Sequence, residues 1–403
     1  MSIVKIKNSF LNGEITIPPS KSVAHRAMLC SFLAGGGEVT PLINSKDMQA
    51  MQQVITSIKN GDNTLDCIES GNTSKFIIPV VAALGKKVTI TGSGTLLKRP
   101  IGEYLRILPE HGVKCLSNNE LPLSIEGKLK SGKYNVAGNV SSQYITGLLF
   151  ALPILEGDSE IVLTTELQSK PYVDMTIKVI SDYGVHIEET PNGYFIKGNQ
   201  VYQKRDYVVE GDWSQAAFFL AAGAINGDIT LKGLDINGTQ GDKEIVNILK
   251  HFGADIEVSQ NTIHVKKSNL NGIKINVSDI PDTVPSLAIV ASFANGTTII
   301  EGAERLRYKE SDRLESVVSN LKKMGVDVKE KPDGMIIKGG NVKGAELDGY
   351  KDHRIVMAFS VAALCAKGET VIKDAESIAK TYPQFFEDYN LLGGKANVID
   401  CMW

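Results

Sequence analysis

The segment Arg305–Leu314 holds the densest group of charged side chains in this chain. Glu310 stands there among cations, so it could transfer protons while its neighbours hold an anionic substrate. If the segment is helical, Lys309 and Arg313 are i,i+4 neighbours of like charge, which is mildly destabilising unless something negative lies between them. The alternative is a surface helix whose charges pair with one another. This segment alone does not separate the two interpretations.

Cationic side chains also stand at the starts of two expected helices. Lys21 and Arg26 flank the first turn of one helix, with the hydroxyl of Ser22 beside them, and His353 and Arg354 open the other. A cation at a helix N-terminus opposes the helix dipole, so it is unfavourable unless an anion binds there. The functional interpretation is a phosphate or carboxylate site, and the alternative is a solvated basic turn.

Other residues could act on anions or protons. Asp282 precedes an apolar helix, where an acid is either a cap or a base. Ser141–Gln143 offers hydroxyls, an amide and backbone N–H groups, which suit a phosphate. Arg99 and Lys380 are cations in loops, and each alone is more often a surface residue.

Six polar clusters of this kind each run into an apolar, helix-like stretch. From the second onward they recur about every 70 residues, and a fixed period on this scale indicates a repeat architecture. Plain capping explains the Ser, Asp and Asn residues in them but does not require the cations. Helix N-termini attract anions, so six of them brought together would form an anion site. The clusters are Pro19–Ser22, Gly71–Ser74, Ser141–Gln143, Gly211–Ser214, Pro281–Thr283 and Lys351–Arg354.

The fourth cluster shows what one repeat unit contains. We expect Ser214 to cap a helix that ends before Gly227. A strand, an amphipathic helix and a hairpin then follow, giving a unit of helix, strand, helix, strand, strand. The expected elements are a helix over Gln215–Ile225, a strand over Ile229–Leu231, a helix over Asp242–His251 stopped by Gly253, and hairpin strands over Asp255–Val258 and Thr262–Val265.

The first unit is shorter than the others, and the chain ends soon after the sixth cluster. Both facts are explained if residues 1–20, with strands near Ile3–Ile6 and Glu14–Ile17, complete the last unit. The chain then crosses between domains near Pro18-Pro19 and again near Glu210-Gly211. We therefore expect one domain of three units over 21–210 and another of three units over 1–20 plus 211–403.

Composition limits the classes of partner. The formal net charge is −3, with 42% hydrophobic and 22% charged residues, which is ordinary for a globular protein and favours neither nucleic acid nor an anionic membrane. No signal peptide or transmembrane run is expected. The five cysteines form no C-x-x-C pair, so we expect a reduced, cytoplasmic protein without a structural zinc site.

Several familiar motifs are absent from the sequence. It contains no G-x-x-x-x-G-K-[ST], no G-x-G-x-x-G after a strand, no H-E-x-x-H and no G-x-S-x-G. The six histidines and five cysteines show no ligand spacing. Phosphate-loop, dinucleotide and metal chemistries are therefore not expected.

The motifs together resemble the 5-enolpyruvylshikimate-3-phosphate synthase family. They appear in the family's order over nearly the whole chain: Pro19–Ser22, Ser141–Gln143, Gln240–Asp242, Ile280–Asp282, Leu306–Arg313, Asp352–Arg354 and Lys380–Pro383. The resemblance implies a two-domain inside-out α/β barrel of six βαβαββ units, with the active site in the interdomain cleft. It implies transfer of the enolpyruvyl group of phosphoenolpyruvate to the 5-hydroxyl of shikimate 3-phosphate, without a cofactor. The domains are expected to close on the substrates.

The resemblance also implies a role for each matching residue. Asp282 would take the proton of the 5-hydroxyl, and Glu310, helped by Lys309, would exchange protons at the enol methylene. Lys21 would act in catalysis and contact both substrates. Shikimate 3-phosphate would be held by Lys21, Ser22, Arg26, Ser141, Ser142, Gln143, Ser169, Tyr172, Asp282, Arg305 and Lys309. Phosphoenolpyruvate would be held by Lys21, Gly71, Asn72, Arg99, Gln143, Arg313, Arg354 and Lys380, with His353 beside them.

Four positions depart from the family's pattern. Lys75 stands where Arg is usual, Arg305 where Asn is expected, Trp213 where a small residue is usual, and Ala24 where Ser is common. A lysine cannot form the bidentate fork of an arginine. These changes bear on affinity more than on the class of reaction. Since Gly71 is retained, glyphosate is an expected inhibitor, to a degree that Asn72 leaves open.

Two other functions remain open at this point. UDP-N-acetylglucosamine enolpyruvyl transferases share the fold and the donor, but typically carry a cysteine in a mobile loop. Cys115 lies instead at the start of an expected hairpin strand, where we interpret it as packing. A non-catalytic anion-binding protein of the same fold is the second alternative, against which the retained Lys21, Asp282, Glu310 and Lys380 argue. A monomer is expected.

Overall fold

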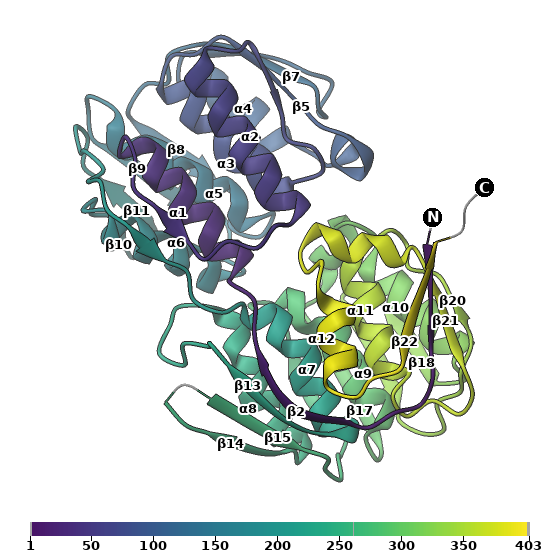
Figure 1. The fold of residues 1–403 in the computed structure, drawn as a ribbon. Coiled ribbons are helices and arrows are strands. Elements are labelled where there is room, and N and C mark those ends of the chain that lie inside the picture. Colours follow the sequence, from purple (N-terminus) through teal and green to yellow (C-terminus); the bar gives the residue numbers. More distant parts are fainter. Residues whose placement is uncertain (1, 261, 401–403) are drawn as a thin grey trace. The chain divides into compact units, whose positions relative to one another are not determined.

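The computed structural model describes residues 2–260 and 262–400, and these form two compact units. One unit is Pro19–Val209, and the other comprises the described residues of Met1–Pro18 and Glu210–Trp403. The chain therefore passes from one unit to the other at Pro18-Pro19 and at Val209-Glu210. Both units mix helices with small sheets (Figure 1).

The repeat appears most simply in the unit that contains residues 274–338. Strand β16 (Lys274–Asn276) pairs in parallel with β17 (Thr297–Glu301), and the hairpin β18 (Asp327–Lys331) and β19 (Gly334–Lys338) adds antiparallel strands, giving the order β16-β17-β19-β18. Helix α9 (Val284–Phe293) connects the first two strands, and α10 (Arg313–Lys323) leads to the hairpin. This is the predicted βαβαββ unit.

The same strand order recurs in five four-stranded sheets among the described residues. In Pro19–Val209 the elements are α1 (Lys21–Leu33), β3 (Val39–Thr40), α2 (Lys46–Asn60), β4 (Thr64–Asp66), α3 (Gly71–Ala83), β5 (Val88–Thr91), α4 (Gly102–Glu110), β6 (Val113–Leu116), β7 (Leu123–Gly127), β8 (Lys133–Val136), α5 (Ser142–Ala151), β9 (Ser159–Leu163), α6 (Lys170–Asp182), β10 (Glu188–Thr190), β11 (Gly193–Ile196) and β12 (Tyr207–Val208). In the other unit the remaining elements are β1 (Ser2–Ile6), β2 (Leu11–Thr16), α7 (Trp213–Asn226), β13 (Gly227–Lys232), α8 (Ile245–Phe252), β14 (Asp255–Val258), β15 (Thr262–Lys266), β20 (Glu346–Leu347), α11 (His353–Ala362), β21 (Thr370–Lys373), α12 (Phe385–Leu391) and β22 (Ala396–Asp400).

All six polar clusters begin helices, as predicted. Side chains of Ser20, Ser70, Ser141, Asp212 and Asp352 accept hydrogen bonds from the first-turn N–H groups of α1, α3, α5, α7 and α11, and the sixth cluster is a 3-10 helix over Pro281–Thr283 that leads into α9. These helices are apolar on nearly every side, and α7 is buried along its whole length. In the same unit α7, α9 and α11 pack against one another. Contacts of Arg354 with Ser214 and with Asp282 bring the polar starts of these three helices together.

One predicted cap was wrong by two residues. Helix α7 begins at Trp213, and its cap is Asp212, whose Oδ1 accepts from the backbone N–H of Ser214 at 2.9 Å and of Gln215 at 3.1 Å. Asp and Ser are both strong caps, and Asp212 satisfies two of the unpaired N–H groups at once. The Ser214 hydroxyl is thereby left to make other contacts.

The rest of that unit follows the prediction closely. The predicted helix over Asp242–His251 is a short 3-10 helix over Gly241–Glu244 followed by α8. Gly253 ends α8 with a φ of +98°, a left-handed conformation that glycine adopts without strain. The hairpin strands β14 and β15 lie where they were expected.

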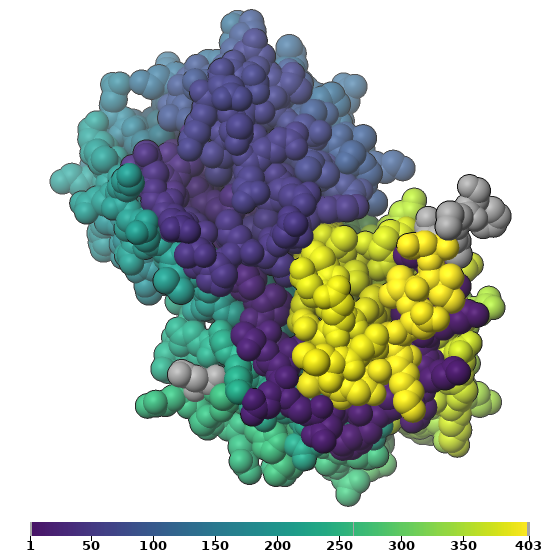
Figure 2. All heavy atoms as spheres, in the orientation of Figure 1, coloured from purple at the N-terminus to yellow at the C-terminus, as the bar shows by residue number. Residues whose placement is uncertain are grey.

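The N-terminal residues divide their strands between two repeat units. Strand β1 pairs with β21 and β22, so it completes the last unit, as predicted. Strand β2 instead pairs in parallel with β13 of the fourth unit, so its assignment to the last unit was wrong. Leu11 and Ile15 are buried in this pairing, which secures the register. Figure 2 shows the purple N-terminal residues beside the yellow C-terminal ones, as the pairing of β1 with β22 requires.

The short first unit lacks a hairpin. Its sheet contains only β3 and β12, paired in parallel through Tyr207 opposite Val39, and the chain runs from α2 directly to β4. The absent hairpin accounts for the shorter spacing between the first two clusters. Among the described residues, no helix is both long enough and apolar enough to cross a lipid bilayer.

Candidate active site

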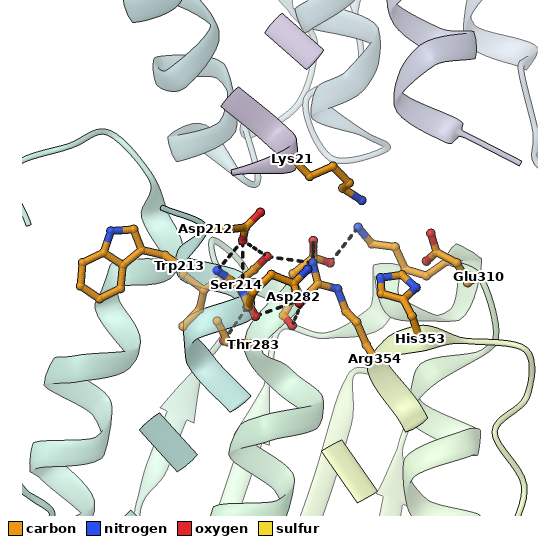
Figure 3. A network of polar contacts seen from close by, with 12 residues as sticks. Lys21, Asp212, Trp213, Ser214, Asp282, Thr283, Glu310, His353 and Arg354 are labelled. Carbon is orange, nitrogen blue, oxygen red and sulfur yellow. Dashed lines mark hydrogen bonds and ion pairs between the residues drawn. The ribbon is translucent and has the colours of Figure 1, made fainter. Parts of the chain in front are cut away.

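The carboxylate of Asp282 contacts three cations at the start of α9. Its Oδ1 lies 3.0 Å from Arg313 Nη1 and 3.5 Å from Lys309 Nζ, and its Oδ2 lies 3.0 Å from Arg354 Nη2. These cations come from two other helix starts, α10 and α11, and from the segment before α10. The network is drawn in Figure 3. The predicted residues Asp282, Lys309, Arg313 and Arg354 are thus brought together.

Arg313 is the centre of this group of charges. It is 1% exposed, and besides Asp282 it contacts Glu310 Oε2 at 2.7 Å and Asp352 Oδ2 at 2.8 Å. Burial alone would lower the pKa of Arg313, but Asp352, Glu310 and Asp282 together hold it above its ordinary value. Burial would likewise raise the pKa of Asp352, but the Arg313 guanidinium holds it below the ordinary value. The pair is therefore ionised.

Lys309 does not lie on a helix with Arg313, so the condition for an i,i+4 relationship between them is not met. A 3-10 helix covers Glu304–Tyr308, Lys309 follows in an extended conformation, and α10 begins only at Arg313 with Asp312 as its cap. The break lets Lys309 contact Asp282, and lets Glu310 contact Arg313, from outside the helix. Burial lowers the pKa of the Lys309 ammonium, against the opposing effect of Asp282.

Arg354 joins this group to the start of α7. Its Nη2 contacts the Ser214 hydroxyl at 3.0 Å, and its Nη1 lies 3.4 Å from the Ser214 carbonyl oxygen and 3.3 Å from that of Asp282. His353 and Lys380 are also buried, and the 3-10 helix that carries Lys380 packs against α11. Arg305 donates to the Ser278 carbonyl oxygen at 2.6 Å.

Trp213, one of the departures, is placed away from the charges. Its indole Nε1 donates to the Asp235 carbonyl oxygen at 3.1 Å, and its backbone N–H donates to Gln240 Oε1 at 3.1 Å. Figure 3 shows the ring directed away from Asp282. The large side chain therefore fills the core beside α7 rather than the site.

In the unit Pro19–Val209, four predicted residues meet at the starts of α3 and α5. Gln143 Nε2 donates to Asn72 Oδ1 at 2.5 Å. A Cβ built on Gly71 would lie 2.5 Å from Arg99 Nη1 and 4.0 Å from Gln143 Nε2. The absence of a side chain at Gly71 is therefore what admits the Arg99 guanidinium. Ser141 caps α5 by accepting from the Gln143 N–H at 3.3 Å.

Arg26 makes its contacts inside the protein. Its Nε donates to Thr176 Oγ1 at 2.8 Å, its Nη1 to the Ser22 carbonyl oxygen at 2.8 Å, and its Nη2 to the Tyr172 carbonyl oxygen at 2.9 Å. Burial lowers the pKa of Arg26 to about 10. Arg26 thus fixes the backbone of Ser22 and Tyr172, two other residues predicted to hold the phosphate.

His25 was not among the predicted residues, although it contacts two of the predicted helix starts. It is fully buried, its Nδ1 lies 2.8 Å from the Lys21 carbonyl oxygen, and its Nε2 lies 3.4 Å from Oγ of Ser70, the cap of α3. Burial lowers its pKa to about 4, so the ring is neutral at pH 7. His25 therefore connects the start of α1 to the start of α3. A buried histidine in an apolar helix was the signal that could have found it.

The other residues of this unit are also held in place. Lys21 Nζ forms an ion pair with Asp47 Oδ2 at 3.0 Å. Ser169 precedes α6 with a φ of +57°, a left-handed conformation that is uncommon for residues other than glycine. The Lys75 ammonium lies 5.5 Å from the centre of the Tyr144 ring, in reach of a cation–π contact.

Cys115 lies on strand β6, as predicted. Its thiol lies 3.9 Å from the Val113 carbonyl oxygen, and burial raises its pKa to about 11. A thiol with a raised pKa is a poor nucleophile at neutral pH. In residues 2–260 and 262–400, no group of three or more His, Cys, Asp or Glu side chains is arranged to hold a metal ion.

The chain is similar to known proteins over nearly its whole length. A sequence model of EPSP synthase (3-phosphoshikimate 1-carboxyvinyltransferase) matches residues 6–63 and 55–389. The chain is 44% identical over 418 residues to the 3-phosphoshikimate 1-carboxyvinyltransferase of Clostridium kluyveri, and 43% identical over 426 residues to that of Clostridium novyi. Each alignment covers 98% of this chain and 98% of the relative.

Solved structures give the same result for the fold. The EPSP synthase of Acinetobacter baumannii superposes with a TM-score of 0.82 at 28% identity, over 99% of this chain and 100% of that one. The enolpyruvyl transferase NikO of Streptomyces tendae superposes with a TM-score of 0.83 at 15% identity, over 100% of this chain and 99% of that one. At that identity the second likeness concerns the fold alone.

Proposed function

This chain belongs to the EPSP synthase family, and we propose that it transfers the enolpyruvyl group of phosphoenolpyruvate to the 5-hydroxyl of shikimate 3-phosphate, releasing phosphate. The two Clostridium relatives are named 3-phosphoshikimate 1-carboxyvinyltransferase, and each alignment covers 98% of this chain. One observation supports the proposed site most strongly. Asp282 and Glu310, the two carboxylates that could exchange protons, both contact Arg313.

The chemistry requires a base, an acid and a positive environment. As the 5-hydroxyl oxygen attacks C2 of phosphoenolpyruvate, Asp282 takes the hydroxyl proton, and Glu310 supplies a proton to C3, which becomes a methyl group. This gives a tetrahedral intermediate. Glu310 then takes a proton back from C3 while the C2–O bond to phosphate breaks, which restores the double bond. Lys309, with its lowered pKa, assists this exchange.

The cations of this unit hold the donor in the proposed reaction. Arg313 and Arg354 are almost fully buried, so their charges act through a medium that screens them poorly. Both already contact carboxylates of the protein itself. The anionic groups of phosphoenolpyruvate therefore compete with Asp282 and Glu310 for the two guanidinium groups. Once the substrate neutralises part of the cationic charge, Asp282 becomes a better base.

The starts of α1, α3, α5 and α6 supply the remaining contacts. Lys21, Ser22, Ser141, Ser142 and Ser169 offer an ammonium, hydroxyls and backbone N–H groups, which suit the phosphate of the acceptor. Arg26 contributes by fixing Ser22 and Tyr172. Gly71, Asn72, Arg99 and Gln143 form the part of the donor site that lies in this unit. We propose that the residues of both units act on the same substrates.

The remaining predictions belong to the same proposal. The domains 21–210 and 1–20 plus 211–403 carry three repeat units each and close on the substrates, no cofactor is needed, and the protein is a cytoplasmic monomer that binds neither nucleic acid nor membrane. Glyphosate is a proposed inhibitor because it would bind beside Gly71. UDP-N-acetylglucosamine is not favoured as acceptor, since the enzymes that use it typically carry a cysteine in a mobile loop. Cys115 lies instead in strand β6, and burial raises the pKa of its thiol.

An acceptor assay tests the proposed function. Phosphate release is measured from phosphoenolpyruvate with shikimate 3-phosphate, and separately with UDP-N-acetylglucosamine at the same concentration. Release that depends on shikimate 3-phosphate is expected, with at least about a hundredfold preference. Only that acceptor carries a terminal phosphate monoester, whose free oxygens can accept from the hydroxyls, N–H groups and cations at the helix starts. Release with the nucleotide sugar alone would overturn the assignment of the substrate. No release with either acceptor would favour a binding protein.

A further inference from the structure

The hydroxyl of Ser214 lies between a carboxylate and the guanidinium group of Arg354. Ser214 Oγ donates to Asp212 Oδ1 at 2.7 Å and accepts from Arg354 Nη2 at 3.0 Å. Ser214, Asp212 and Arg354 are 7%, 3% and 1% exposed, so water has little access to these bonds. Figure 3 shows the three side chains in a row that ends at Asp282.

The direction of these hydrogen bonds is fixed by what each group can do. Arg354 can only donate, so the Ser214 oxygen must accept from it, and the serine proton must point elsewhere. Asp212 accepts the hydrogen bond from the serine hydroxyl. The same carboxylate oxygen also accepts from the backbone N–H groups of Ser214 and Gln215. Since Asp212 caps α7, it cannot turn away without uncapping the helix. The rigid start of α7 therefore sets the position of the hydroxyl.

The same Arg354 nitrogen also contacts the base. Arg354 Nη2 lies 3.0 Å from Ser214 Oγ and 3.0 Å from Asp282 Oδ2, while Nη1 lies near the carbonyl oxygens of both residues. Ser214 and Asp282 therefore each contact both terminal nitrogens of the guanidinium group. Because the group is planar and both of its terminal nitrogens are held, these contacts fix the orientation of its plane.

Resting on the proposed function, we propose that Ser214 is a positioning residue for the reaction. Through Arg354, its hydroxyl orients the cation that binds the anionic donor and that faces the Asp282 carboxylate. It touches neither substrate in this proposal. Its effect is therefore expected on the affinity for phosphoenolpyruvate and on the pH at which Asp282 becomes active, and not on the affinity for shikimate 3-phosphate.

The pH effect depends on every charge that faces Asp282. Among the described residues these include Lys309 before α10, Arg313 in α10 and Arg354 in α11. Glu310 and Asp352 contact Arg313, and Asp212 contacts Ser214. Removing the Ser214 hydroxyl changes none of these charges. It loosens Arg354 alone, so Asp282 loses part of one favourable interaction and ionises at a higher pH.

The test compares Ser214→Ala with two matched variants of the full chain. Ser286→Ala removes a hydroxyl that is also buried, lies on the neighbouring helix α9, and has no hydrogen-bond partner among the described residues. Ser214→Thr keeps the hydroxyl. Steady-state kinetics with both substrates, the pH dependence of kcat/KM and the Tm are measured for all of them.

We expect Ser214→Ala to raise KM for phosphoenolpyruvate about tenfold, as loss of a hydrogen bond to a charged group implies. The acid limb of the pH profile should move to higher pH, while KM for shikimate 3-phosphate changes less than about twofold. Ser214→Thr should restore most of the loss, and Ser286→Ala should behave as wild type. If Ser214→Ala does not fold, Asp212→Asn, which keeps a capping side chain, should show the same changes to a smaller degree.

Three results would overturn the proposal. The first is an unchanged KM for phosphoenolpyruvate in Ser214→Ala, and the second is an equal rise for both substrates with a lowered Tm, since that is the result of a merely structural role. The third is an equal effect of Ser286→Ala. The proposed function fails separately, when the wild-type chain releases no phosphate from the two substrates.

Discussion

Arg313 and Asp352 form an ion pair in the interior of the unit that contains α10 and α11. Arg313 Nε lies 2.8 Å from Asp352 Oδ2 and Nη2 lies 3.3 Å from Oδ1, with both side chains 1% exposed or less. Asp352 also caps α11 by accepting from the Arg354 N–H at 2.9 Å. One carboxylate therefore sets the direction of the two arginines that contact Asp282.

Asp352→Asn should destabilise the protein, because it leaves the buried Arg313 without the partner charge that it contacts through both Nε and Nη2. Asparagine can still cap the helix, so the expected loss of unfolding free energy, about 3 kcal/mol, comes from the ion pair. Urea unfolding measures it. Glu126→Gln, which breaks the exposed pair of Lys87 and Glu126, is the control and should lose less than about 1 kcal/mol. Equal losses in the two variants would contradict this account of the pair.

The stability of the protein should fall when the pH is lowered from 6.5 to about 4, in part because of His25. The pKa of His25 is 6.5 ordinarily and about 4 in the folded protein, so in this window the unfolded chain takes up a proton that the folded protein refuses. A shift of this size corresponds to about 3 kcal/mol. Asp352 has a lowered pKa in the folded protein, so its contribution to the free energy of unfolding is lost only at pH values below the ordinary carboxyl pKa of 3.8.

His25→Asn should flatten this part of the curve of unfolding free energy against pH. Met28→Ala, at a buried apolar position of the same helix, should lower the free energy by a similar amount at every pH and keep the slope. Denaturant unfolding at a series of pH values makes the comparison. A slope that survives His25→Asn would show that another group is responsible.

Gly71→Ala should weaken the binding of the donor. The new Cβ would lie 2.5 Å from Arg99 Nη1, so the guanidinium must move, and KM for phosphoenolpyruvate should rise about tenfold with a parallel loss of inhibition by glyphosate. Gly340→Ala is the control, because a Cβ there meets nothing within 4 Å. An unchanged KM in Gly71→Ala would remove Arg99 from the proposed donor site.

Tyr144→Phe should produce a smaller effect on the same substrate. The Tyr144 hydroxyl donates to the Pro100 carbonyl oxygen at 2.7 Å and so holds the segment that carries Arg99. We expect KM for phosphoenolpyruvate to rise about threefold to tenfold. Tyr202→Phe removes a buried hydroxyl that donates to the Phe150 carbonyl oxygen, and it should change stability without changing KM. A rise in KM in both variants would indicate a general loss of structure.

The repeat was predictable because it depends on local signals. Polar caps, apolar helices and stopping glycines lie next to one another in the sequence, so the six helix starts and the βαβαββ order followed from residues within each unit. The partner of strand β2 could not be predicted in this way, since β1 and β2 are both short strands and only tertiary pairing assigns them to different sheets.

The contacts of the predicted site residues were not foreseeable from their spacing. Arg26 was predicted to hold shikimate 3-phosphate, but nothing in its spacing indicated that it donates to the carbonyl oxygens of Ser22 and Tyr172. Arg313 was predicted to hold phosphoenolpyruvate, but nothing in its spacing indicated that it pairs with Asp352, which lies far along the sequence. Such long-range pairing depends on which helix starts the fold brings together, and local sequence does not encode it.

The most direct test of the account concerns Glu310, which is the group proposed to exchange protons at the enol methylene. Initial rates of phosphate release from shikimate 3-phosphate and phosphoenolpyruvate are compared for the wild type, Glu310→Gln and Glu315→Gln, an exposed position in the first turn of α10. The account predicts rapid release by the wild type and by Glu315→Gln, and a loss of about a thousandfold in kcat for Glu310→Gln. A kcat for Glu310→Gln within about tenfold of the wild type, too small a loss for general acid–base catalysis, would contradict the assignment.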